Sequence, residues 1–97
     1  MNKDVLSIHR EHIDELDEKL IRLLAERFEI TKAVGAFKAE QGLPAADPER
    51  EAEQIKRLHK IANEVGMDPE FSVKVFRLIV DEVIRHHEQT AEESLRS

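Results

Sequence analysis

An apolar heptad stripe runs through the first forty residues, a stretch that contains no proline. The stripe uses two heptad positions, one filled by Leu6, Ile13, Leu20 and Val34 and the other by Leu16, Leu23, Ile30 and Phe37. This spacing predicts a helix over about residues 5–40. Such a helix is roughly 50 Å long, whereas a compact chain of 97 residues has a radius of gyration near ~13 Å. We therefore expect a second chain to cover the stripe, in an intertwined homodimeric helical bundle.

Two aspartate-proline pairs, at positions 47–48 and 68–69, divide the rest of the chain. Each offers an N-cap carboxylate followed by proline at the first helical position, where the missing N–H costs nothing. Glycines at 42 and 66 stand a few residues earlier, where C-terminal caps are expected. The pattern predicts a second helix over 48–65 and a third from 69 to about 93, and no stretch alternates as a strand would. The expected fold class is all-α, with one long and two shorter helices per chain.

Length and composition narrow the class of protein. The chain fits one domain, residues 1–97, whose last residues 91–97 are expected to fray. Cysteine is absent, which excludes disulfides and thiolate chemistry. A formal charge of −6 argues against nucleic acid as a partner, and no apolar run has the length of a membrane span or the form of a signal peptide. We expect a soluble, cytoplasmic protein.

Arg27 occupies the heptad position between Leu20 and Val34, in the middle of an otherwise apolar stripe. A guanidinium at such a place is costly unless it meets an anion. The anion is either a carboxylate of a neighbouring helix or a bound ligand, and Arg27 alone leaves both open. Lys38 lies three helical turns further on and returns to nearly the same face. Two cations on one stripe strengthen the hypothesis of a bound anion.

The start of the second predicted helix places Arg50 among acidic residues, Asp47, Glu49 and Glu51. The carboxylates have a structural explanation, as an N-cap and as complements of the helix dipole. Arg50 has none, because a cation is disfavoured at this end of a helix. Beside free backbone N–H groups and two carboxylates, its guanidinium could contact an anion that also carries a hydroxyl.

The adjacent histidines His86 and His87 face different directions on the third predicted helix. The apolar arc of this helix consists of Phe76, Ile79, Val80, Val83 and Ile84. His87 falls near the centre of the arc, and His86 lies about 100° away, at the margin beside Glu82. Neighbouring helical residues cannot chelate one ion together, so we expect no metal site. A lone inward histidine is usually a core residue, but the cations described above favour a functional one.

Two runs of the sequence, LDEKLIRLLAERFEITKAVGAFK and DPEREAEQIKRL, together with their spacing, resemble the all-helical (type II) chorismate mutases. The resemblance covers nearly the whole chain, from Arg10 to His87. It implies an intertwined helical dimer with two active sites, which converts chorismate to prephenate in aromatic amino-acid biosynthesis. This unimolecular Claisen rearrangement needs no metal, cofactor or nucleophile. It requires a near-attack conformer of the substrate and positive charge beside the ether oxygen.

The resemblance implies a set of cations that binds the substrate. Arg27, with Arg10 donated by the second chain, would bind one carboxylate, while Arg50 and Lys38 would hold the remaining anionic and ether groups. Arg10 and Lys38 are 28 residues apart on one predicted helix, a distance of roughly 42 Å. They meet in one site only if two chains supply them.

The resemblance also implies contacts from the second and third helices. Glu51, with the backbone around Asp47, would bind the ring hydroxyl. His87 stands where the family usually carries a glutamine or glutamate that donates a hydrogen bond to the ether oxygen. Val83 replaces what is often a small polar residue, so one substrate contact is missing or made by backbone. An imidazole donates either as imidazolium or as one neutral tautomer, so we expect activity that depends on pH more than in a glutamine enzyme.

Three other hypotheses are compatible with the sequence. A lyase that eliminates pyruvate from isochorismate uses a similar bundle and cation set. A catalytically silent module of the same fold would bind a ligand or partner, and Val83 and His87 keep this hypothesis open. A purely structural helical dimer would explain the stripes alone. Some small mutases of this type are activated by the first enzyme of the shikimate pathway, and the sequence carries no signal for or against such a partner.

Overall fold

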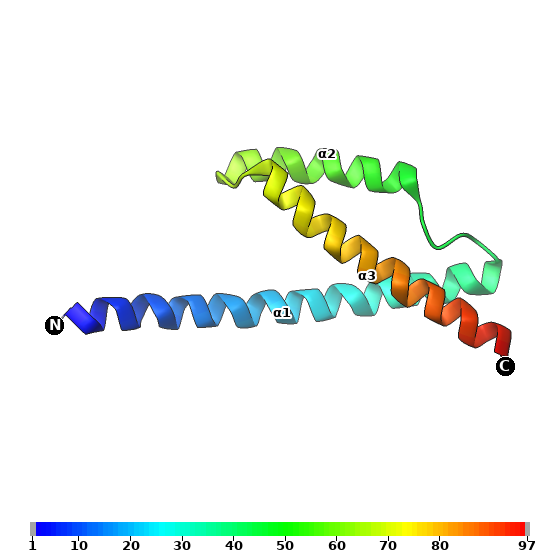
Figure 1. Cartoon of the computed structure of the whole chain (residues 1–97), viewed down its shortest axis with the longest axis horizontal. Helices are drawn as coiled ribbons and strands as arrows, with labels where there is room; N and C mark the ends of the chain where they lie inside the picture. The colour runs from blue at the N-terminus through cyan, green and yellow to red at the C-terminus, as the bar shows by residue number, and fades with distance from the viewer. Residues whose placement is uncertain (1, 97) are drawn as a thin grey trace. The chain divides into compact units, whose positions relative to one another are not determined.

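Three α-helices make up the computed structural model, which describes residues 2–96 and the side chains of residues 4–93 and 95. They are α1 (Asn2–Gln41), α2 (Pro48–Val65) and α3 (Pro69–Arg96), and residues 2–96 contain no strand (Figure 1). The predicted all-α class with three helices is confirmed. α2 has the predicted bounds, whereas α1 begins earlier and α3 runs further than the sequence predicted. Fraying of the last residues stays a prediction, and Ser97 lies outside the described residues.

The chain divides into two compact units between Thr31 and Lys32, and each is described by itself. The first unit is the larger part of α1, whose heptad residues lie on the surface: Leu6 is 51 % exposed and Leu23 is 62 % exposed. Apolar area left in water contributes nothing to folding. Within residues 2–96, none of the helices combines the length and the apolar character needed to cross a membrane.

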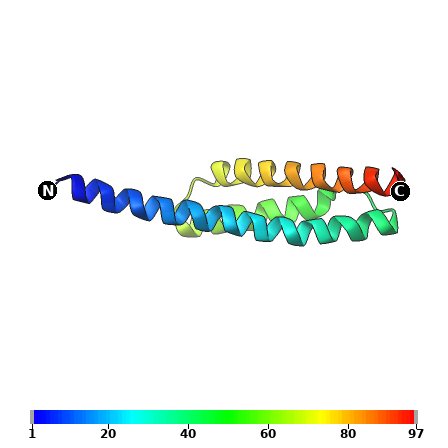
Figure 2. The same ribbon diagram turned by 90° about the horizontal axis from the view of Figure 1, so that it is seen from below.

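The second unit contains the end of α1 and a hairpin of α2 and α3. The two hairpin helices pack against each other; Figure 1 shows them meeting at the turn after α2 and separating toward their other ends, and Figure 2 shows the same pair from a second side. Ala62 of α2 and Phe76 of α3 are the buried apolar residues among the described side chains. Val65, the last residue of α2, is exposed.

Both predicted N-caps are present. The Asp47 carboxylate accepts a hydrogen bond from the Arg50 backbone N–H at 3.2 Å, and the Asp68 carboxylate accepts one from the Glu70 N–H at 3.0 Å. Each bond satisfies a backbone donor that the helix itself leaves without a partner. These caps fix where α2 and α3 begin.

Both glycines predicted to cap helix C-termini take the left-handed conformation, with φ 68° at Gly42 and φ 76° at Gly66. After Gly42 the chain turns back, and the Leu43 N–H donates to the Lys38 carbonyl at 2.8 Å. Glycine adopts this conformation without the steric cost that a Cβ would add. The turn carries the chain from the end of α1 into the irregular loop of residues 42–47 (Figure 1).

Candidate active site

Two side chains from different helices converge on one backbone oxygen, the carbonyl of Ala45 in the loop between α1 and α2. The Lys38 ammonium of α1 donates to this oxygen at 3.3 Å, and Nδ1 of His87 on α3 lies 3.4 Å from it. A carbonyl oxygen only accepts hydrogen bonds, so this contact requires the proton on Nδ1 of the imidazole. The second unit therefore holds two donors that point at a single acceptor.

His87 is buried, with 5 % of its surface exposed, as the helical periodicity of α3 predicted. Its ring lies against Gly35 of α1: a Cβ built on Gly35 would come within 2.9 Å of Nε2 and 3.2 Å of Cγ. One edge of the imidazole thus faces the α1 backbone, and the Nδ1 edge faces Ala45. Between these two contacts the ring has a defined position.

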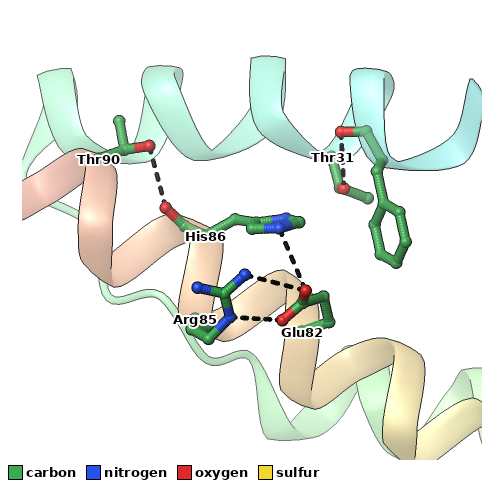
Figure 3. Close-up of polar contacts among 6 residues, drawn as sticks. Thr31, Glu82, Arg85, His86 and Thr90 are labelled. Atoms are coloured by element: carbon green, nitrogen blue, oxygen red, sulfur yellow. Dashed lines mark hydrogen bonds and ion pairs between the residues drawn. The ribbon is translucent and has the colours of Figure 1, made fainter. Parts of the chain in front are cut away.

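His86 points to a different neighbour. Its Nε2 lies 3.6 Å from the Glu82 carboxylate, which also accepts two hydrogen bonds from the Arg85 guanidinium (Figure 3). The predicted position at the margin beside Glu82 is confirmed, and 14 % of the His86 side chain is exposed. The hydroxyl of Thr90, one turn further on, donates to the His86 carbonyl at 3.0 Å. The two adjacent histidines therefore lie in different surroundings. The described side chains form no group of three or more acidic or histidine residues able to hold a metal ion.

The contact with Arg85 changes the titration of Glu82. The hydrogen bond from Arg85 has the largest effect and lowers the pKa of the Glu82 carboxyl. Burial opposes it, and the charges of Arg85, His86 and Lys32 each lower the pKa by a smaller amount, so that the net shift is downward. The same hydrogen bond raises the pKa of the Arg85 guanidinium. Each charged form stabilises the other.

Val83 lies one turn before His87 on α3, on the face that the periodicity assigned to the interior. Val83 is partly buried, between the buried Phe76 and the buried His87 along the helix. The predicted inward face of α3 is confirmed by these burials. The contact that Val83 makes or omits with a substrate stays a prediction.

The start of α2 engages its polar residues in helix capping. The Asp47 carboxylate binds the Arg50 N–H, and the Asp47 carbonyl accepts from the Glu51 N–H at 3.0 Å. The Arg50 side chain is exposed and Glu51 is partly buried. The substrate contacts predicted for these three residues stay predictions.

The first unit carries the other two predicted site residues. Arg10 is exposed. Arg27 is partly buried, and its Nη1 is buried without a hydrogen-bond partner among the described residues. Nearby on the same helix, the Thr31 hydroxyl donates to the Phe28 carbonyl at 3.2 Å (Figure 3). The anion that Arg27 meets, either a carboxylate of a neighbouring helix or a bound ligand, stays a prediction. A buried guanidinium nitrogen without a partner is costly, which is consistent with either one.

Two features of the site were missed by sequence reasoning. The Ala45 carbonyl belongs to the backbone, so no residue type marks it. Gly35 did leave a signal, because glycine in a helix interior is about 0.8–1.0 kcal/mol less favourable than alanine and commonly has a packing reason. That reason here is the ring of His87.

The sequence is similar to one protein family and to several characterised proteins. The profile of the family described as chorismate mutase type II matches residues 9–88. The chorismate mutase of Methanocaldococcus jannaschii is 36% identical over 72 residues, which cover 74% of this chain and 73% of that protein. The bifunctional chorismate mutase/prephenate dehydratase of Escherichia coli K12 is 36% identical over 77% of this chain, and the T-protein of Enterobacter agglomerans is 38% identical over 79%. The chain spans only 19% and 21% of the length of these two proteins. Since the family profile covers most of the chain, from the first unit through His87, the chain belongs to the type II chorismate mutase family.

Proposed function

We propose that the chain catalyses the rearrangement of chorismate to prephenate in the cytoplasmic biosynthesis of aromatic amino acids. The observation that carries the proposal is the convergence of Lys38 and His87 on one oxygen, the Ala45 carbonyl. In the Claisen rearrangement the ether C–O bond breaks while a C–C bond forms, and negative charge grows on the ether oxygen. Two donors already aimed at one acceptor supply the stabilisation that this oxygen needs.

In this mechanism the ether oxygen takes the place of the Ala45 carbonyl as the shared acceptor. The Lys38 ammonium and the Nδ1–H of His87 donate to it, and their hydrogen bonds strengthen as the C–O bond breaks. No proton is transferred and no covalent intermediate forms. The rest of the rate enhancement comes from holding the enolpyruvyl group over the ring in a near-attack conformer.

Cations at the ends of the substrate provide this hold. Arg27 binds one carboxylate, a role supported by its buried Nη1, which has no partner among the described residues. Arg50, at the start of α2, binds the remaining anionic groups. Glu51, with the backbone around Asp47, binds the ring hydroxyl. The roles of Arg50, Glu51 and Asp47 rest on the family resemblance.

The active form in this proposal is a homodimer. The heptad stripe of α1 supports it: all eight of its residues are exposed in the single chain, between 43 % at Val34 and 63 % at Ile30. A second copy carries the same stripe and covers it by symmetry. Arg10 would then enter the site of the partner chain, since Arg10 and Lys38 are 28 residues apart on α1.

The test is turnover of chorismate by the purified chain, without added metal or cofactor. We expect loss of chorismate absorbance and prephenate as the identified product. Lys38→Ala should lower kcat/KM about 10²–10³-fold, as the removal of one transition-state donor does. Lys60→Ala, which changes an exposed lysine of α2, is the matched control and should keep the parental rate. Isochorismate is assayed in parallel, and turnover of isochorismate alone would contradict the proposal.

A further inference from the structure

Gly35 is a buried glycine of α1 that contacts the imidazole of His87. Its backbone does not require glycine, because the positive-φ residues of the described chain are Gly42 and Gly66. Alanine is the better helix former at a position of ordinary helical conformation. The absence of a side chain at Gly35 is therefore explained by the space that the ring occupies.

The space is too small for a methyl group. A Cβ on Gly35 would lie 2.9 Å from Nε2 and 3.2 Å from Cγ of His87, and separations under 3.0 Å are essentially never seen for a real Cβ. The ring would have to move away from α1. On the other edge of the same ring, Nδ1 lies 3.4 Å from the Ala45 carbonyl, so a displacement of the ring also moves Nδ1 relative to that acceptor.

We propose that Gly35 is a positioning residue, which sets where the imidazole of His87 lies so that Nδ1 reaches the acceptor shared with Lys38. The inference rests on the proposed function of His87 as an ether-oxygen donor. Gly35 itself does not touch the reacting atoms. It acts by letting the ring lie directly on the α1 backbone, in the gap between that helix and Ala45.

The experiment compares four proteins: the parent, Gly35→Ala, His87→Ala and the double variant. Gly35→Ala should lower kcat at least about tenfold with a smaller change in KM, since a displaced donor loses its effect mainly in the transition state. In the His87→Ala background, where the ring is gone, adding Gly35→Ala should change kcat by less than about twofold. Ala36→Ser, at an exposed neighbouring position of α1, is the control and should keep the parental kcat.

Melting temperatures give a second readout that a general effect on the helix would not reproduce. Gly35→Ala should lower the Tm of the parent, because the methyl group collides with the ring. The same substitution should raise the Tm of His87→Ala, because alanine then gains helix propensity and meets no ring. If Gly35→Ala alone fails to fold, a higher Tm of the double variant than of His87→Ala decides the matter.

Three outcomes would overturn the inference. They are a parental kcat in Gly35→Ala, equal losses of kcat in the two backgrounds, and a lowered Tm in both backgrounds. Failure of the proposed function is distinct from these, because it would leave the parent without chorismate turnover. In that case the two Tm shifts still decide whether Gly35 makes room for the ring, but the proposed effect of Gly35 on catalysis would be withdrawn.

Discussion

The heptad stripe of α1 and the inner face of the α2–α3 hairpin contain similar apolar residues, but only the hairpin covers them within one chain. Phe76 on α3 retains 5 % of its exposure, whereas Leu20 on α1 retains 56 %. Both patterns follow the same helical periodicity, and only the length of the first helix indicated in advance that its stripe needs cover from a second chain. Periodicity therefore predicts which residues need to be buried, and the tertiary structure shows which helix buries them.

The polar groups of the two regions differ in the same way. Lys38 and His87 both have a hydrogen-bond acceptor in their own chain, the Ala45 carbonyl. Nη1 of Arg27 is buried without a partner among the described residues. The second unit thus has its donors arranged in advance. On our proposal the α1 stripe needs a second chain, and Arg27 needs the carboxylate of a substrate.

The strongest way to break this comparison is to place a charge in the stripe. Leu20→Glu should abolish both dimerisation and chorismate turnover, a loss of more than about 10³-fold, because the carboxylate would be buried without a partner between two chains. The mass in solution, measured by light scattering, and kcat/KM are the two readouts.

Arg22→Glu is the control, since Arg22 is an exposed residue paired with Glu18 at 3.5 Å. It introduces the same residue on the opposite side of the helix from Leu20. It should remain dimeric and active. A dimeric, active Leu20→Glu variant would show that the stripe is not the interface.

The next effect in size concerns the arginines of α1. Arg27→Ala and Arg10→Ala should each lower kcat/KM about 10²–10³-fold, because each removes a charge-assisted contact with a substrate carboxylate. If Arg10 acts across the dimer, a heterodimer of the two variants contains one site with both lesions and one intact site. Equal amounts, unfolded and refolded together, should then recover about a quarter of the parental activity, since half of the dimers are mixed.

The control for this mixture is each variant refolded alone, which should stay inactive. A mixture no more active than its components would place Arg10 and Arg27 in the same chain's site, or Arg10 outside the site. Either result would remove the reason for assigning Arg10 to the partner chain.

A smaller effect sharpens the role of the ring between Gly35 and Ala45. The parental kcat/KM should depend on pH more than that of a glutamine variant, because an imidazole can donate to the ether oxygen with or without a positive charge, whereas an amide donates in one form only. The charged group facing this ring through the shared carbonyl is Lys38 of α1. His87→Gln should weaken this dependence in a profile measured from about pH 5 to about pH 9.

His86→Gln is the matched control, one residue away and directed at Glu82 instead of Ala45. Its pH profile should match that of the parent. Identical profiles for the parent and His87→Gln would mean that the imidazole does not donate to the ether oxygen.

Local sequence rules predicted most of the fold. The Asp-Pro pairs and the glycines at 42 and 66 act within a few residues, and they place the helix ends as the structure has them. The helical phase also separated His87 from His86. What the rules missed depends on residues distant in the sequence: the Ala45 carbonyl meets His87 across 42 positions, and the packing of Gly35 depends on the same ring. Family resemblance gave roles to side chains, but a backbone oxygen and a missing methyl group have no motif.

The smallest expected effect concerns the ion pair of Glu82 and Arg85 on α3, which His86 adjoins. The hydrogen bond from Arg85 holds the pKa of Glu82 below its ordinary value of 4.5, so folding favours the carboxylate. Its contribution to stability is therefore present above about pH 4.5 and is lost as pH falls through the lowered pKa. Because the pair is exposed to solvent, the contribution is small.

Urea unfolding of the parent and Glu82→Gln, from neutral pH to about pH 3, measures this contribution. The parent should have the higher midpoint at neutral pH, and the two midpoints should converge in acid. Glu88→Gln is the control, because Glu88 is an exposed α3 residue without an ion pair among the described side chains. It should show no such convergence. A midpoint difference that persists in acid would mean that Glu82 acts through packing, and its surroundings would then resemble the hairpin interior more than a solvated surface.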